Sequence, residues 1–232
     1  MAVPVAVIVS HGQPGDPEPQ EQAIRDLALR VAAEDPGCEI RGATMAMPGA
    51  LAAACDDDSL IYPMFMAEGW FTGHLLPREL ARAGAGGARI LPPFGSDSGL
   101  AGLVATTAQR AAAAQGWTAA DTTLLLSAHG SGRSQASFEM TSALARQVAP
   151  RFARAVTGFV EQPPFIAAAA RNLTRAVHLP LFALRAEHVL KDLPQALDEA
   201  GFSGPRLDPI GLAPEVPAMI AATIRHNILN LK

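Results

Sequence analysis

Three residues in the second half of the chain, His129, Glu161 and His188, are of the types that bind divalent transition metals in proteins. Each follows an apolar run that is typical of a buried strand, and the carboxyl ends of parallel strands meet at one edge of a sheet. We therefore expect the three side chains to lie close together. Two imidazoles and one carboxylate suit iron or cobalt, and three protein ligands leave positions open for water or a substrate.

The first half of the chain repeats two of these three residues. His11 and His74 also follow apolar runs, but the position that corresponds to Glu161 is Ala46, which can neither bind a metal nor accept a proton. A single histidine in such a place is more often a helix cap or a loop residue, whereas a pair that recurs in both halves favours a functional role. The sequence predicts a complete site in the second half and a degenerate secondary site, His11 and His74, in the first.

An internal repeat underlies this correspondence. The matching segments are VAVIVSHGQPG (5–15) with TLLLSAHGSGR (123–133), TMAMPGALAAA (44–54) with FVEQPPFIAAA (159–169), and YPMFMAEGWFTGHLLPREL (62–80) with LPLFALRAEHVLKDLPQAL (179–197). His129 follows His11 by 118 residues, and His188 follows His74 by 114. Three segments in one order at nearly one spacing predict two related halves, residues 1–116 and 117–232.

Strands and helices are predicted to alternate along both halves, which indicates an α/β fold with mainly parallel sheets. In the first half the expected strands are residues 3–9, 40–45, 60–65 and 88–91, and the expected helices are 18–33, a short one near Leu51, 75–82 and 100–115. In the second half the expected strands are 122–127, 153–160 and 177–184, and the expected helices are 137–148, 165–176, 190–200 and 213–229.

Composition excludes several classes of protein. Of the 232 residues, 49% are hydrophobic and 17% are charged, which provides enough apolar material for a core and argues against a disordered chain. The net charge of −4 argues against a general nucleic-acid binder. Cys38 and Cys55 cannot form a disulfide framework, so a reducing cytoplasm is expected. We also expect no signal peptide and no membrane span.

Other catalytic motifs find little support. Histidine phosphatases carry an arginine directly before a strand-end His-Gly, where this chain has Ser10 and Ala128. No GxxxxGK[ST] or GxSxG motif occurs, which argues against a nucleotide cofactor and against a serine hydrolase. His178 lies within an apolar strand and is expected in the core. Phe65, Trp70 and Phe71 precede His74 in an insertion that the second half lacks, and could cover a flat ligand or pack on the domain edge.

The motifs LLLSAHGSGRS, GFVEQPP and PLFALRAEHVLKDLP, with SHGQPGDP and FTGHLLPREL in the first half, resemble those of the sirohydrochlorin cobaltochelatase/ferrochelatase family of class II tetrapyrrole chelatases. The resemblance covers nearly the whole chain. It implies two similar parallel-sheet α/β halves around a central cleft. It also implies that His129, Glu161 and His188 are both metal ligands and catalytic residues, although members differ in which half is active.

The resemblance further implies ATP-independent insertion of Co²⁺ or Fe²⁺ into sirohydrochlorin or a related tetrapyrrole, in cobalamin or siroheme biosynthesis. The metal would be a substrate, and Arg133 and Arg185 are candidates to bind the carboxylates of the macrocycle. Two alternatives stay open, a non-catalytic metal or tetrapyrrole carrier and a histidine-phosphatase-like enzyme. No nucleic-acid or membrane partner is expected; the duplication is consistent with a monomer, and a homodimer stays open.

Overall fold

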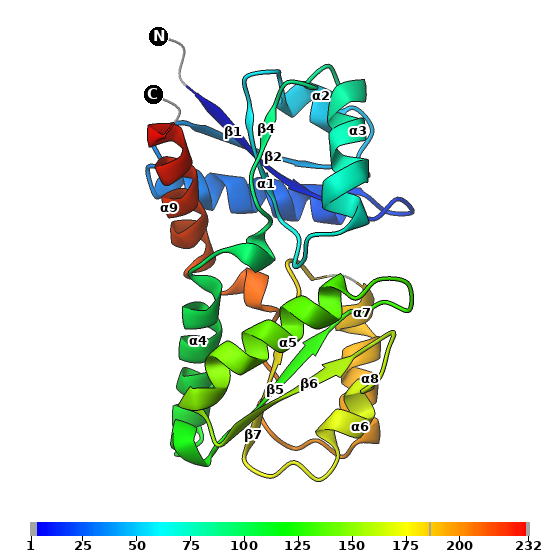
Figure 1. Cartoon of the computed structure of the whole chain (residues 1–232), viewed down its shortest axis with the longest axis vertical. Helices are drawn as coiled ribbons and strands as arrows, with labels where there is room; N and C mark the ends of the chain where they lie inside the picture. The colour runs from blue at the N-terminus through cyan, green and yellow to red at the C-terminus, as the bar shows by residue number, and fades with distance from the viewer. Residues whose placement is uncertain (1–3, 186, 231–232) are drawn as a thin grey trace. The chain divides into compact units, whose positions relative to one another are not determined.

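The computed structural model describes residues 4–185 and 187–230 of the chain (Figure 1). The chain forms two compact units. The first unit comprises Met1–Asp97 and Pro214–Lys232, and the second unit comprises Ser98–Ala213. Each unit is an α/β structure with its own sheet, and all strand pairs in both sheets are parallel.

The first unit contains a four-stranded sheet in the order β2-β1-β3-β4. Its strands are β1 (Val5–Ser10), β2 (Glu39–Thr44), β3 (Leu60–Pro63) and β4 (Arg89–Ile90), and its helices are α1 (Glu18–Ala33), α2 (Ala50–Ala54), α3 (Leu76–Arg82) and α9 (Val216–Leu229). The central strand β1 is buried on both faces, which explains its continuous apolar run. On one face α2 and α3 share a hydrophobic core with the strands, while α1 contacts β2 and packs beside α9.

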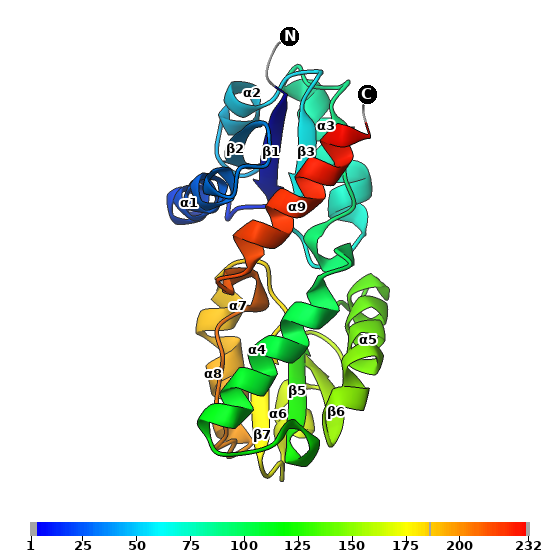
Figure 2. The same ribbon diagram turned by 90° about the vertical axis from the view of Figure 1, so that its left-hand side faces the viewer.

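The second unit repeats this arrangement with three strands in the order β6-β5-β7. The strands are β5 (Thr123–Ala128), β6 (Arg154–Phe159) and β7 (Ala176–Pro180), and the helices are α4 (Leu100–Ala114), α5 (Ala136–Val148), α6 (Ile166–Ala170), α7 (Glu187–Leu190) and α8 (Asp192–Glu199). Figure 2 shows α4 running in front of β5 and β7, and α6 and α8 share a core with β5 residue Leu125. Arg206 pairs with His178 of β7 through an isolated parallel bridge. It takes the place beside β7 that β4 has beside β3 in the first unit.

The bounds of the two units differ from the division that was expected at residue 116. Helix α4, the last helix of the first half, packs against β7 and α5 of the second unit. Helix α9, the last helix of the second half, packs against α1 of the first unit. Both helices present apolar faces that a sequence pattern cannot assign to one sheet rather than the other, because only tertiary packing decides which strands they cover.

Several expected elements have different bounds in the structure. The helix expected over residues 165–176 is limited to α6, because the backbone of Arg171 is extended and Asn172 and Arg175 then adopt left-handed conformations with φ of 59° and 47°. The helix expected over 190–200 is α8, Asp192–Glu199, and it is preceded by the short helix α7, which was not expected. The helix expected from residue 213 begins at Val216. The strand expected over 177–184 ends at Pro180.

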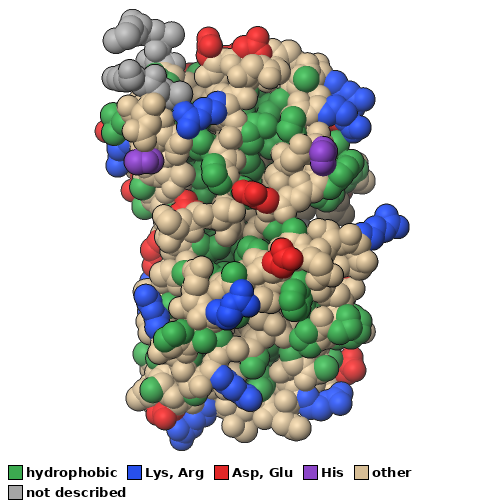
Figure 3. Space-filling view, viewed as in Figure 1, with side chains coloured by type: hydrophobic (Ala, Val, Ile, Leu, Met, Phe, Trp, Pro, Cys, Tyr) green, Lys and Arg blue, Asp and Glu red, His purple; other side chains and the backbone are tan. Residues whose placement is uncertain are grey.

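Basic and acidic side chains are interspersed on the face shown in Figure 3. Within the described ranges, every helix is too short or too polar to cross a membrane.

Candidate metal centre

His129, Glu161 and His188 converge in the second unit. One nitrogen from each imidazole and one carboxylate oxygen all lie within 4.8 Å of one another. His129 directly follows β5, and Glu161 follows the end of β6 by two residues. His188 lies on α7, a short helix beyond the end of β7, and therefore not at a strand end as the sequence suggested.

Backbone hydrogen bonds hold Glu161 beside His129. The N–H of Glu161 donates to the carbonyl oxygen of His129 over 2.9 Å, so the loop after β6 is fastened to the loop after β5. Gly130 makes this close approach possible, because its φ is +73° and a Cβ at this position would lie 2.8 Å from Cγ of Gln162. Gln162 in turn accepts a 2.6 Å hydrogen bond from the N–H of Ser131.

The two imidazoles face each other through their Nε2 atoms, which are 2.9 Å apart. Nδ1 of His129 lies 2.8 Å from the carbonyl oxygen of Gly130, and Nδ1 of His188 lies 2.5 Å from a carboxylate oxygen of Asp192. A carbonyl and a carboxylate accept hydrogen bonds, so the proton of each neutral ring belongs on Nδ1. Both Nε2 atoms then direct a lone pair at the same region, where a metal cation would satisfy both. Metal-binding histidines are commonly oriented in this way.

Glu161 supplies the negative charge of the site. One of its carboxylate oxygens lies 3.6 Å from Nδ1 of His129. The side chains of His129, Glu161 and His188 are 43%, 48% and 35% exposed, so a substrate can reach all three.

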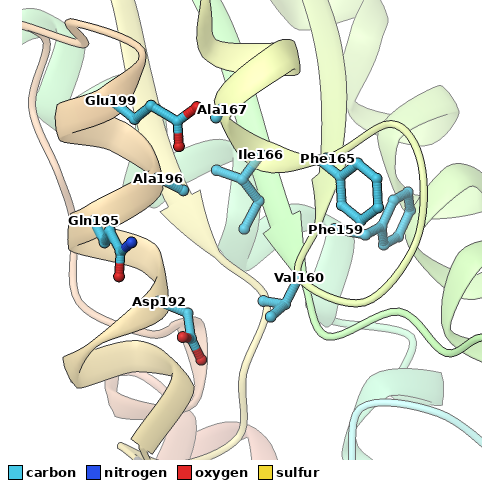
Figure 4. Close-up of a pocket in the computed structure, with 9 residues that line it drawn as sticks. All are labelled: Phe159, Val160, Phe165, Ile166, Ala167, Asp192, Gln195, Ala196 and Glu199. Atoms are coloured by element: carbon cyan, nitrogen blue, oxygen red, sulfur yellow. The ribbon is translucent and has the colours of Figure 1, made fainter.

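Sequence reasoning missed Asp192, whose carboxylate contacts His188. It lies four residues after His188, a spacing that places two side chains on the same side of a helix, and this spacing was the available signal. Asp192 also lines a pocket of about 240 Å³ beside the site (Figure 4). The pocket is lined by Phe159, Val160, Phe165, Ile166, Ala167, Asp192, Gln195, Ala196 and Glu199. In Figure 4, Asp192 and Glu199 project from α8 on one side of the pocket, and Phe165 lies on the other side.

The first unit retains the backbone of this site. Nδ1 of His11 lies 2.7 Å from the carbonyl oxygen of Gly12, and the N–H of Ala46 donates to the carbonyl oxygen of His11 over 2.9 Å. These contacts match those of His129 and Glu161, so Ala46 is the structural counterpart of Glu161.

The ring that faces His11, however, belongs to Phe71. The two ring centroids are 4.7 Å apart with an interplanar angle of 82°, close to the 4.4 Å and 85° between His129 and His188. His74 lies exposed on a π-helical turn, Phe71–Leu75. Phe71 therefore takes the place that an imidazole has in the second unit.

The two arginines expected to bind substrate are both exposed. Arg133 lies in the loop after His129, where its N–H donates to the hydroxyl of Ser131 over 3.1 Å. The guanidinium of Arg185 forms an ion pair with Asp208.

His178 has the core position expected of it. Its Nε2 lies 2.8 Å from the hydroxyl oxygen of Ser127, and burial, followed by the nearby charge of Arg206, lowers the pKa of its imidazole to about 3. This histidine is therefore neutral at ordinary pH.

The comparison with known proteins identifies the family. The sequence model of the CbiX family matches residues 123–227, which contain all three converging residues. A solved structure described as CbiX, the terminal enzyme for biosynthesis of siroheme in denitrifying bacteria, is 59% identical, with a TM-score of 0.91 over 95% of this chain and 98% of that chain. The chain belongs to the CbiX family. No curated protein matches it by sequence.

More distant structures share the CbiX fold. SirB from Bacillus subtilis, solved with Fe³⁺, is 12% identical with a TM-score of 0.77, over 99% of this chain and 97% of that one. The sirohydrochlorin chelatase SirB from a Bacillus subtilis subspecies, solved in complex with cobalt, is 13% identical with a TM-score of 0.69 over the same shares of the two chains.

Proposed function

We propose that this chain inserts Co²⁺ or Fe²⁺ into sirohydrochlorin without ATP, as a step of siroheme or cobalamin biosynthesis. The observation that carries the proposal is the pair of facing Nε2 atoms of His129 and His188, 2.9 Å apart, with the other nitrogen of each ring held by an acceptor. Membership of the CbiX family supports it, since the similar structure is described as a siroheme biosynthesis enzyme. The complex of a sirohydrochlorin chelatase with cobalt supports the choice of substrates.

The ligand set suits a metal that must be released. His129 and His188 are neutral donors, and Glu161 contributes one negative charge, so the bound dication is only partly neutralised. Three protein ligands leave coordination positions free for the nitrogens of the macrocycle. The metal can therefore exchange protein ligands for ring nitrogens, whereas a closed four-ligand site would retain it.

Metal insertion also requires the removal of two protons. The metal forms bonds to the ring nitrogens as two pyrrole N–H bonds break, and the two protons leave so that charge balances. Glu161 is the base that we assign to this step, because its carboxylate lies beside the imidazoles and is 48% exposed, which allows it to pass each proton to water. Asp192 holds the ring of His188 and keeps its Nε2 directed at the metal.

The periphery of sirohydrochlorin carries carboxylates, which guanidinium groups bind well. We assign this role to Arg133 and Arg185, both exposed in the second unit. Arg185 would exchange its present partner, Asp208, for a substrate carboxylate. We also propose that the second half of the chain is the catalytic one, since Ala46 and Phe71 leave the first half without two of the three ligands.

The test is to mix the protein with Co²⁺ and metal-free sirohydrochlorin, without ATP, and to follow the change in absorbance of the macrocycle. The wild type should accelerate insertion over the uncatalysed rate, and His188→Ala should lose most of this acceleration. Glu161→Gln keeps the size of the side chain but removes its charge and basicity, and should be similarly impaired. If the wild type binds both substrates but does not accelerate insertion, the protein is a carrier and the proposal is wrong.

A further inference from the structure

The first unit has an exposed cluster of aromatic side chains that the proposed chemistry does not use. Phe65, Trp70 and Phe71 form this cluster, which we call the aromatic platform. Trp70 is 57% exposed and Phe71 is 43% exposed. The ring centroids of Trp70 and Phe71 are 5.3 Å apart, and those of Phe65 and Phe71 are 6.4 Å apart with the planes inclined by 24°. Adjoining aromatic rings left open to solvent are typical of binding surfaces.

The platform lies at the edge of the sheet where α/β proteins bind ligands. Phe65 follows the carboxyl end of β3 by two residues, and Phe71 begins the π-helical turn Phe71–Leu75, a feature that is frequent at functional sites. The turn is fastened by hydrogen bonds, since the N–H of Gly69 donates to Oγ1 of Thr72 over 3.0 Å and the N–H of Gly73 donates to the carbonyl oxygen of Gly69 over 2.8 Å. The turn that carries Phe71 is therefore fixed by its own hydrogen bonds.

The platform is also the counterpart of the metal centre. Phe71 faces His11 in the same edge-on arrangement in which His188 faces His129. In the first unit the second imidazole is thus replaced by a phenyl ring, and two further aromatic rings adjoin it. The exchange removes a metal ligand and adds an apolar aromatic surface.

We propose that the aromatic platform binds the flat face of the tetrapyrrole macrocycle, an inference that rests on the proposed function. A conjugated macrocycle is planar and apolar on its faces and charged only at its periphery. Aromatic side chains bind such faces by offset stacking or by edge-to-face contacts. The rings of the platform carry no charge, so they contact the face of the macrocycle and leave its carboxylates to other groups.

The test replaces Trp70, the most exposed ring of the platform, with leucine. The dissociation constant of metal-free sirohydrochlorin, measured from the absorbance of the macrocycle, should rise about tenfold, the loss expected for one aromatic contact. Trp70→Phe keeps an aromatic ring and should restore most of the affinity. The affinity for Co²⁺ alone, measured from the visible absorption of bound Co²⁺, should not change.

The matched control is Trp117→Leu, which makes the same substitution at the other tryptophan. Trp117 precedes β5 and so lies at the amino end of that strand, away from the ligand-binding edge of its own sheet. This variant should bind sirohydrochlorin like the wild type, and thermal melting should show that both variants fold.

An unchanged affinity for sirohydrochlorin in folded Trp70→Leu overturns the proposal. So does a change from dimer to monomer in this variant at unchanged affinity, because the platform would then bind a second copy of the chain. Weaker binding by Trp70→Leu together with absence of insertion by the wild type would support the platform and refute the chelatase. Normal insertion by the wild type, together with unchanged affinity of Trp70→Leu for sirohydrochlorin, would support the chelatase and refute the platform.

Discussion

The hydrogen bond between His188 and Asp192 predicts a measurable loss of metal affinity when the carboxylate is neutralised. In Asp192→Asn, only the amide oxygen can accept a hydrogen bond from Nδ1 of His188, and this oxygen carries no negative charge. If the amide turns its NH₂ group toward Nδ1, the ring proton must move to Nε2, which blocks the metal. Either outcome weakens Co²⁺ binding without altering a metal ligand.

The size of the effect follows from the contact. Loss of a partner that orients a metal-binding histidine typically costs about 10- to 100-fold in affinity. The Nδ1 to carboxylate distance of 2.5 Å is short, but the side chains of His188 and Asp192 are 35% and 44% exposed, so water can partly replace the lost acceptor. We therefore expect the lower end of the range, about tenfold or ~1.4 kcal/mol.

The assay is a titration with Co²⁺ followed by calorimetry or by the visible absorption of the bound ion. Glu199→Gln is the matched control, since it removes the same charge from the same helix and the same pocket, seven residues farther along. This control should bind Co²⁺ within about twofold of the wild type, because charges that are well separated and exposed are screened. Equal losses in the two variants would show that only the net charge matters, and would refute the orienting role of Asp192.

Three further predictions concern other parts of the molecule. In insertion assays His188→Ala should lose most activity and His74→Ala should keep a substantial part of it; the inverse result would assign catalysis to the first half. Because His178 has a pKa of about 3 in the folded protein and near 6.5 when unfolded, the unfolded chain takes up the proton first and stability falls as pH decreases below about 6.5. Urea titrations at pH 7 and pH 4.5 should show a loss of roughly 2 to 3 kcal/mol from this residue, which His178→Gln should lack. Ala46→Glu combined with Phe71→His should add a second Co²⁺ site that calorimetry detects, whereas Ala46→Glu alone should not.

Strands and long helices were predictable because their patterns are strong and local. The expected strand over residues 122–127 became β5, Thr123–Ala128, and the expected helix over 18–33 is α1, Glu18–Ala33. The convergence of His129 with Glu161 was predictable for the same reason, because adjacent parallel strands fix where the residues that follow them lie.

Features that depend on backbone conformation or on tertiary packing were not predictable. Helix α6 ends early because Arg171 is extended and Asn172 is left-handed, conformations that neither residue type specifies on its own. The place of His188 on α7 was missed because His188 lies eight residues after Pro180, far enough for a helical turn to form after the strand. No sequence signal shows that α4 belongs to the second unit and α9 to the first, since both helices carry apolar faces suited to either sheet.

The first unit shows how a repeat in the sequence can mislead at the level of a single side chain. The repeat pairs His74 with His188, and both follow strands and precede similar apolar segments. The insertion before His74 adds three residues relative to the second half and is accommodated by a π-helical turn. That turn brings Phe71, three residues earlier, to the edge of His11, and it leaves His74 exposed. The backbone contacts around His11 and His129 are the same, so the difference between the two sites arises from Ala46 and from the insertion. A strand-end histidine in this fold is therefore not sufficient evidence of a metal site; the ring that faces it decides what the site can bind.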